Sequence, residues 1–178
     1  YMEIIIAEVD RINRLVKKMM SISRPTSNDF KPINIHQILE EILTLEKETL
    51  LRKKGTFIQA YDPSLPAIQG NEDELKQVFL NLVKNAVEAS PEGGQVKITT
   101  QFSSNYVLRK TQGSPPTHSI IVEITDSGPG MTDETLKNLF TPFFTTKKRG
   151  TGLGMVVSLK IIENHNGKIK INSKKNVG

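Results

Sequence analysis

Apolar residues recur at helical spacing at the start of the chain. They stand alternately four and three positions apart, which is the a/d pattern of a coiled coil or a helix bundle. The stripe consists of Ile5, Val9, Ile12, Val16 and Met19. Because one helix cannot bury such a stripe, residues 1–24 are predicted to form one helix of a bundle, which Pro25 ends. No capping residue precedes the pattern, so we expect the helix to begin upstream of this sequence.

Two further amphipathic helices follow a linker. Residues 25–34 are rich in Pro, Ser, Asn and Asp, a composition typical of a linker. Asn34 is a suitable N-cap for a helix over residues 35–52, whose apolar residues share one face. Asn71 is a suitable N-cap for a longer helix that runs through Ala89.

Shorter elements alternate with these helices. Strands are predicted at residues 56–61, 95–102, 119–125 and 168–173, and helices at 133–140 and 153–166. Gly55 and Gly167 are predicted to end the helices that precede them. The polar loop 103–118 is predicted to be a hairpin tip. The pattern therefore predicts an α+β fold, with a layer of helices on a mixed sheet.

Composition narrows the class of protein. A chain of 178 residues suits one domain with an appendage. It has no cysteine, no signal-peptide pattern and no apolar run of about 18 residues, so we expect a soluble cytoplasmic protein without disulfides or a membrane segment. The net charge of +5 comes from scattered lysines, without a basic stripe interleaved with aromatic residues. We therefore expect no nucleic-acid partner.

Candidate chemistry begins with two amides. Asn81 and Asn85 stand four positions apart, so both side chains share one face of the predicted helix. An amide oxygen can serve as a ligand of Mg²⁺, whose octahedron phosphates and water complete. The same pattern also fits amides on a helix surface or hydrogen bonds between helices, and the spacing does not decide between these interpretations.

A second motif follows a predicted strand. Asp126 comes directly after the apolar segment 120–124 and before Gly128 and Gly130. A carboxylate at a strand end can accept a hydrogen bond from an exocyclic amine such as that of adenine, and glycine permits close approach of the backbone. An ordinary turn is the equally open alternative.

Two glycine- and phenylalanine-rich segments complete the set. Residues 150–154 open a predicted helix, where free N–H groups and the helix dipole attract phosphate, and Lys147 lies just before them. Met155 stands where a Walker A loop requires lysine. Phe140, Phe143 and Phe144 indicate a mobile lid over residues 131–149. A flexible glycine linker and core phenylalanines are the alternatives.

Together these motifs resemble the asparagine, first glycine, phenylalanine and second glycine boxes of bacterial sensor histidine kinases. That superfamily includes DNA gyrase, the MutL proteins and the ninety-kilodalton heat-shock chaperone. The resemblance covers residues 70–173, and segments 61–66, 74–81 and 91–94 look most like nitrogen-regulation kinases of the NtrB type, with sporulation kinases second. It implies a Bergerat-type two-layer α/β sandwich.

The resemblance also implies the domain organisation. Residues 1–24 would be the second helix of a dimerisation and phosphotransfer hairpin, 25–34 a linker, and 35–178 the ATP-binding catalytic domain. The final strand of that domain in the family would lie beyond Gly178, so we expect it to be missing. The intact parent protein would be a homodimer.

Site roles follow from the same resemblance. Asn85 would be the Mg²⁺ ligand and Asn81 a second contact to metal or phosphate. Asp126 would bind the adenine amine, and Lys147 a phosphate. The remaining expected nucleotide contacts are Gly128, Gly130, Thr151, Gly152, Leu153 and Gly154.

The implied activity is protein histidine kinase: Mg-ATP would donate its γ-phosphate to a histidine, for relay to an aspartate of a response regulator. The expected acceptor histidine is absent, since His36, His118 and His165 lie outside any acceptor pattern. We therefore expect no autophosphorylation by this chain alone. The alternative is an ATP-gated module of the gyrase type, in which an acidic residue replaces Asn81 as general base. The amide at this position favours the kinase.

Overall fold

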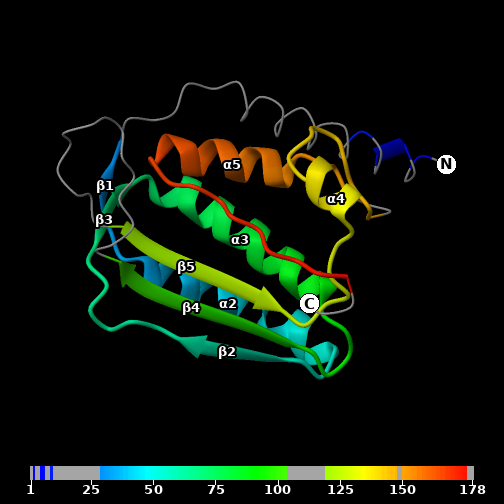
Figure 1. Ribbon diagram of the computed structural model, residues 1–178, viewed down its shortest axis with the longest axis horizontal. Coiled ribbons are helices and arrows are strands. Elements are labelled where there is room, and N and C mark those ends of the chain that lie inside the picture. The colour runs from blue at the N-terminus through cyan, green and yellow to red at the C-terminus, as the bar shows by residue number, and fades with distance from the viewer. Residues whose placement is uncertain are drawn as a thin grey trace.

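Helices and strands form two layers in the computed structural model (Figure 1). The structure describes residues 29–103, 119–147 and 150–175, together with residues 2, 5, 6 and 9. The helices are α2 Ile35–Arg52, α3 Glu72–Ala89, α4 Asp133–Asn138 and α5 Gly154–Asn164. The strands are β1 Lys31–Ile33, β2 Thr56–Ala60, β3 Ile68–Gly70, β4 Gln95–Ser103 and β5 Ser119–Asp126. The predicted α+β sandwich is confirmed.

The main sheet has the order β2-β4-β5 and is mixed, as predicted. Strand β2 runs parallel to β4, and β4 runs antiparallel to β5 with Val96 opposite Asp126. Along β4 the residues Val96 and Ile98 are completely buried while Lys97 between them is exposed. This alternation places one face of the sheet against the helices.

Helix α3 is the centre of the helical layer. It contacts α2 and α5 on its two sides and strands β4 and β5 beneath it. Both predicted caps are confirmed: the Asn34 side chain accepts from the N–H of His36, and the Asn71 side chain accepts from the N–H of Glu74. The residues buried between α2, α3 and the sheet include Leu39, Val83, Val87, Val96 and Ile98.

Part of the predicted linker is a strand. β1 Lys31–Ile33 pairs antiparallel with β3 Ile68–Gly70, and neither strand was predicted. Strands of three residues are too short to show an alternating pattern, and Pro32 weakens the signal further because proline cannot donate to a ladder. This small sheet therefore depends on pairing between segments more than thirty positions apart in the sequence, which a local pattern does not show.

The predicted strand at 168–173 is wrong. The structure assigns no strand there, because the segment has no ladder partner among the described residues. It makes a side-chain contact instead: the Ser173 hydroxyl accepts a hydrogen bond from the N–H of Met131 at 2.9 Å. Figure 1 shows this segment running back from α5 toward the C-terminal end of the described chain.

Two helix ends differ from prediction in detail. The residue in the left-handed conformation is Lys54 after α2 (φ 55°) and Asn166 after α5 (φ 57°), rather than the glycine that follows each. Those glycines are needed for space: a Cβ on Gly55 would lie 2.6 Å from Leu50 Cδ1. The N–H of Gly167 donates to the carbonyl of Ile162, which closes α5.

The predicted bundle helix is described at four positions only. Met2, Ile5, Ile6 and Val9 are helical, and each is at least half exposed. Its other residues, and residues 104–118 of the predicted hairpin tip, lie outside the described residues. Among the described helices, none combines the length and the apolar character needed to span a membrane.

Asp62 joins the turn after β2 to the end of β4. Its Oδ1 accepts from the hydroxyl of Ser64 at 2.6 Å and from the N–H of Ser64 at 2.9 Å, and its Oδ2 accepts from the N–H of Phe102 at 3.0 Å. The hydrogen bond from the Ser64 hydroxyl is the largest cause that lowers the pKa of Asp62, followed by those from the two N–H groups.

We expect Asp62→Asn to lower the melting temperature at neutral pH, because an amide has one oxygen and cannot accept from both Ser64 and Phe102. Since the folded-state pKa is lowered, the carboxylate stabilises the fold above its ordinary pKa of about 3.9. That contribution is lost as the pH falls through the lowered value. The difference in melting temperature, followed by circular dichroism against pH, should therefore shrink in acid. Exposed Glu163→Gln is the control, and a difference independent of pH would contradict the assignment.

Candidate functional site

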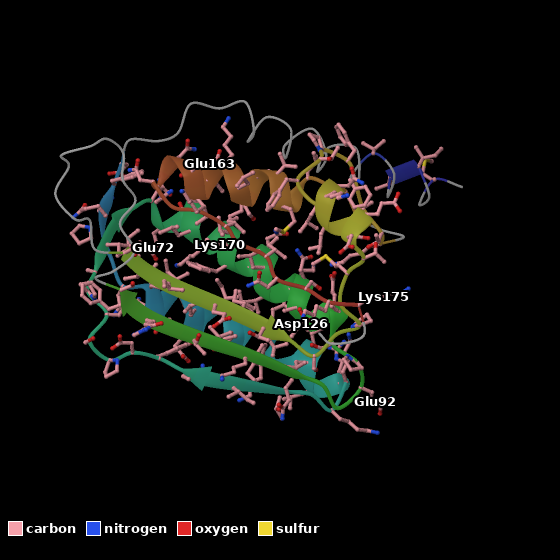
Figure 2. All side chains as sticks on the ribbon, viewed as in Figure 1. Glu72, Glu92, Asp126, Glu163, Lys170 and Lys175 are labelled. Carbon is pink, nitrogen blue, oxygen red and sulfur yellow. The ribbon has the colours of Figure 1, made fainter. Side chains whose placement is uncertain are left out.

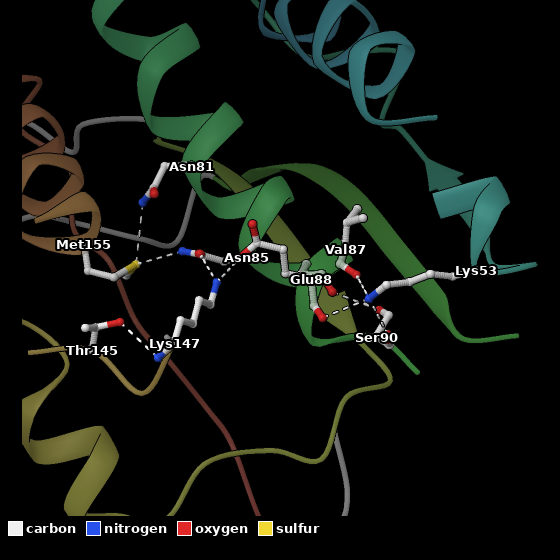
Figure 3. A network of polar contacts seen from close by, with 10 residues as sticks. Lys53, Asn81, Asn85, Val87, Glu88, Ser90, Thr145, Lys147 and Met155 are labelled. Atoms are coloured by element: carbon white, nitrogen blue, oxygen red, sulfur yellow. Dashed lines mark hydrogen bonds and ion pairs between the residues drawn. The ribbon is translucent and has the colours of Figure 1, made fainter. Parts of the chain in front are cut away.

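The two motif amides lie where α3 meets α5 (Figure 3). Asn81 Nδ2 donates to the hydroxyl of Ser158 at 3.1 Å and to the sulfur of Met155 at 3.8 Å. Asn85 Nδ2 lies 3.8 Å from the same sulfur. A Cβ on Gly154 would stand 2.4 Å from Asn81 Oδ1, so any larger residue would force this amide to move away from the start of α5. The hydrogen bonds between helices that the sequence left open are therefore present for Asn81.

Asn85 differs from Asn81 in what its oxygen binds. The ammonium of Lys147 donates to Asn85 Oδ1 at 2.7 Å and contacts Glu88 Oε2 at 2.5 Å. The structure thus brings together Lys147 and Asn85, which the sequence placed 62 positions apart. Glu88 was missed by the sequence analysis, although its position three residues after Asn85 places it on the same face of the helix.

A second cation, which the sequence did not predict, lies at the end of α3. The ammonium of Lys53 donates to the carbonyl oxygens of Val87, Glu88 and Ser90, each at 2.9 Å (Figure 3). The last turn of α3 contains no basic residue of its own. Lys53, the C-cap residue of α2, therefore supplies the positive charge that the negative end of a helix favours.

Asp126 ends β5 beside the C-terminus of α3. Its Oδ1 accepts from the N–H of Gly128 at 2.8 Å, and a Cβ on Gly128 would lie 3.0 Å from the carbonyl oxygen of Ala89. This is turn chemistry, as one interpretation of the sequence expected. Asp126 Oδ2 accepts no hydrogen bond from the residues that the structure describes, which leaves this oxygen for another donor.

The predicted lid, residues 131–149, begins beside the end of the described chain, where the N–H of Met131 donates to the hydroxyl of Ser173. Gly130 has φ 68°, and an added Cβ would collide with the carbonyl of Lys174. Figure 2 labels Asp126 at the end of β5 and Lys175 at the end of the described chain, on the same side of the molecule. Helix α4 follows, with Thr132 as its N-cap.

The phenylalanines of the lid are not core residues. Phe140 and Phe144 are half-buried, and Phe143 is 58% exposed. Phe143 also has φ 67°, which is strained for a bulky side chain. Its N–H donates to the carbonyl of Gly152 at 3.1 Å, and a Cβ on Gly152 (φ 65°) would lie 2.3 Å from the Phe143 carbonyl carbon. The backbone conformation of the predicted lid at Phe143 and that of the glycine segment at Gly152 thus depend on each other. Lys148 and Arg149 lie outside the described residues.

The glycine segment opens helix α5. Thr151 is half-buried, and Leu153 is completely buried and stands at the N-cap, where its side chain accepts no hydrogen bond. The first turn of α5 contains no acidic residue. Its N–H groups and the positive end of the helix dipole therefore suit an anion such as phosphate.

The residues present fit a divalent cation held jointly with phosphate. The described residues contain no group of three or more His, Cys, Asp or Glu that could hold a metal by itself. Asn85 and Glu88 nevertheless offer two side-chain oxygens that already bind one cation, the ammonium of Lys147. An open depression of about 460 Å³ lies elsewhere, on α2, and is lined by Glu40, Glu41, Thr44 and Leu45. It contains none of the motif residues.

Comparison with known families matches residues 70–178 to the model described as histidine kinase-, DNA gyrase B- and HSP90-like ATPase. The sensory histidine kinase/phosphatase NtrB of Azospirillum brasilense is 41% identical over 170 residues, which are 93% of this chain and 42% of that protein. Sporulation kinase A of Bacillus subtilis is 35% identical over 175 residues, 97% of this chain and 27% of that protein.

Among solved structures, histidine kinase ThkA in complex with the response regulator protein TrrA is similar, with a TM-score of 0.74 and 29% identity. The match covers 99% of this chain and 48% of that chain. The chain therefore spans less than half the length of these three relatives.

We expect Lys53→Met to lower the free energy of unfolding by about 1 kcal/mol, because hydrogen bonds from a charged donor contribute about 1.5–3 kcal/mol and partial exposure reduces this. Urea denaturation followed by circular dichroism measures the change. The matched control is Lys54→Met, since Lys54 is the next residue and pairs with Glu92 at 2.6 Å between side chains 78% and 70% exposed. Its effect should be smaller, and equal losses in the two variants would argue against capping of α3 by Lys53.

Proposed function

The chain belongs to the family of histidine kinase-, DNA gyrase B- and HSP90-like ATPases, and from this premise we propose that it is the ATP-binding catalytic domain of a two-component sensor histidine kinase. In this proposal the chain binds Mg-ATP and donates the γ-phosphate to a histidine outside it. We propose that the intact parent protein is a homodimer and that this domain lies in the cytoplasm. We propose no nucleic-acid partner.

One observation carries the proposal: the N-terminal end of α5 meets the C-terminal half of α3 at the motif amides. Asn81 and Asn85 lie in the C-terminal half of α3, and their contacts are with Gly154, Met155 and Ser158 at the start of α5. The negative end of α3 favours a cation, and the positive end of α5 favours an anion. Adjacent sites of opposite preference suit a metal ion bound together with phosphate.

Each side chain has a role in this proposal. Asn85 Oδ1 is the metal ligand, and Asn81 orients the start of α5 through Ser158. The N–H groups of Gly152, Leu153 and Gly154 bind phosphate, which Lys147 also contacts. Bound Mg²⁺ supplies charge neutralisation for phosphoryl transfer, a reaction that depends mainly on positioning and electrostatics.

The adenine end of the nucleotide is assigned to the turn after β5. Asp126 keeps Oδ1 in its own turn through the N–H of Gly128 and presents Oδ2 to the exocyclic amine. Gly128 and Gly130 keep the backbone of this turn free of side chains, and Thr151 is proposed as a further contact. These roles rest on family resemblance together with the positions described above.

The contacts of Asn81 favour transfer over hydrolysis. An amide cannot take a proton from water, and its nitrogen already donates to Ser158. Both described histidines make hydrogen bonds within the fold. The ring of His36 stacks on Tyr61 and is hydrogen-bonded to the hydroxyl of Thr100, and His165 accepts a hydrogen bond from the N–H of Asn71. His118 lies outside the described residues. An acceptor histidine supplied by another segment is consistent with these contacts.

The partner and the pathway are proposed by analogy with the relatives. Kinase ThkA was solved in complex with a response regulator, and we infer that phosphate from the parent of this chain passes to an aspartate of such a regulator. The name of the NtrB relative makes nitrogen regulation the first candidate for the process served.

Calorimetric titration tests the proposal. A non-hydrolysable ATP analogue is titrated with and without Mg²⁺, and GTP is titrated alongside. We expect selective binding of the adenine nucleotide that Mg²⁺ strengthens. In a separate assay with ATP itself and Mg²⁺, phosphate should appear on histidine only when a separate helical domain with an acceptor histidine is added. Absence of nucleotide binding would refute the proposed function, and rapid ATP hydrolysis by the chain alone would favour the gyrase-type module.

We expect Asn85→Ala to abolish the strengthening of nucleotide binding by Mg²⁺ without changing the melting temperature appreciably, because the variant lacks the proposed ligand oxygen while the residue is half-buried and outside the core. The same titrations measure this. Lys84→Ala, exposed on the same helix, is the matched control. Survival of the full Mg²⁺ effect in Asn85→Ala would rule out Asn85 as the ligand.

We expect Asp126→Asn to reduce the preference for adenine over guanine nucleotides on the order of tenfold, which corresponds to the loss of one hydrogen bond to a charged acceptor. Competition between ATP and GTP analogues measures the preference. Glu123→Gln, on the exposed side of the same strand, should leave it unchanged. An unaltered preference in Asp126→Asn would show that the carboxylate serves the turn alone.

A further inference from the structure

Lys147 connects the second limb of the lid to α3. Its ammonium contacts Asn85 Oδ1 and Glu88 Oε2, while its own N–H donates to the hydroxyl of Thr145 at 3.1 Å and its carbonyl accepts from the N–H of Gly150. Figure 3 shows the ammonium directed at the two side chains of α3. The ammonium of Lys147 therefore attaches this limb of the predicted lid to α3.

The oxygens at the end of α3 are divided between two lysines. Lys53 binds the backbone carbonyls of Val87, Glu88 and Ser90, and Lys147 binds side-chain oxygens only. An ammonium has three donors and no acceptor, so it satisfies the same kind of oxygen ligands that Mg²⁺ prefers. The side-chain oxygens of Asn85 and Glu88 are thus a seat for a cation at the negative end of the helix.

The contacts of the Lys147 ammonium with Asn85 and Glu88 are of a kind that another cation can easily replace. The side chains of Lys147 and Glu88 are 42% and 40% exposed. Solvent screening and side-chain entropy leave little net stabilisation in such a pair. Lys53, in contrast, makes three backbone hydrogen bonds at once and stays in place as a structural cap.

We propose that Asn85 and Glu88 together form the cation seat of the nucleotide site, and that Lys147 occupies it until Mg²⁺ arrives with nucleotide and replaces the ammonium. Glu88 becomes a contact of the metal, directly or through water, and the released Lys147 stays three residues from Gly150, close to the phosphates at the start of α5. The inference rests on the proposed function, because it concerns the metal of the same site.

The exchange predicts how Mg²⁺ dependence responds to two substitutions. The measured quantity is the Mg²⁺ concentration that gives half of the strengthening of ADP binding in calorimetry. Lys147→Met removes the competing cation, so this concentration should fall several-fold relative to the unmodified chain. Glu88→Gln introduced into the Lys147→Met chain removes a carboxylate from the metal. The Mg²⁺ concentration for half of the strengthening should therefore rise several-fold above its value in Lys147→Met. Comparing the two in this order separates loss of the competitor from loss of the ligand.

A second measurement needs no nucleotide. Without Mg²⁺, amide hydrogen exchange over residues 139–147 should be faster in Lys147→Met, because that limb of the lid loses its attachment to α3. The control for both measurements is the exposed pair Lys54–Glu92. Lys54→Met and Glu92→Gln should change neither the Mg²⁺ concentration nor the exchange of the lid.

The outcomes separate the inference from the proposed function. If the unmodified chain binds ADP with Mg²⁺ and Lys147→Met leaves both the Mg²⁺ concentration and lid exchange unchanged, the exchange of cations is refuted and the proposed function stands. An unchanged Mg²⁺ concentration on adding Glu88→Gln refutes the role of Glu88 at the metal. If the unmodified chain shows no Mg²⁺-dependent nucleotide binding, both the inference and the proposed function fail.

Discussion

The candidate site depends on the close approach of the C-terminal half of α3 to the N-terminal end of α5. Residue 154 has no side chain, so the first turn of α5 lies directly against the amide of Asn81 in its present position. The two helix ends have opposite dipole charges, which places a preference for cations beside a preference for anions. The hydrogen bond from Asn81 to Ser158 keeps the two ends in this arrangement.

Two lysines then determine what the end of α3 can bind. Lys53, just after the end of α2, donates hydrogen bonds to the last backbone carbonyls of α3 and to that of Ser90, so the fold itself uses those oxygens. Asn85 and Glu88 keep their side-chain oxygens for a cation that is exchangeable, and Lys147 is that cation in the structure. Stability and binding therefore use different atoms of the same helix turn.

The loops around this junction are built from close backbone contacts. Gly152 lies against the backbone of Phe143, and Gly130 lies against the carbonyl of Lys174. Both glycines have positive φ, and Phe143 adopts a positive φ despite its large side chain. The exposed Phe143 is thus held in a strained conformation by the glycine segment, and the base of the lid is specified by sterics as much as by hydrogen bonds.

The local pattern of apolar and polar residues was enough to predict the elements that depend on residues close in sequence. The periodicity of α2 and α3, the caps Asn34 and Asn71, and the pairing of β4 with β5 could be predicted because each depends on neighbours along the chain. The motifs also placed Asn81, Asn85 and Asp126 on the right elements. The tertiary structure alone decided the rest: strands β1 and β3, which are too short to carry a pattern, the absence of a strand at 168–173, and the contacts of Lys53 and Lys147 with α3. These depend on atoms that are distant in sequence, and a pattern of residue types contains no information on which distant atoms meet.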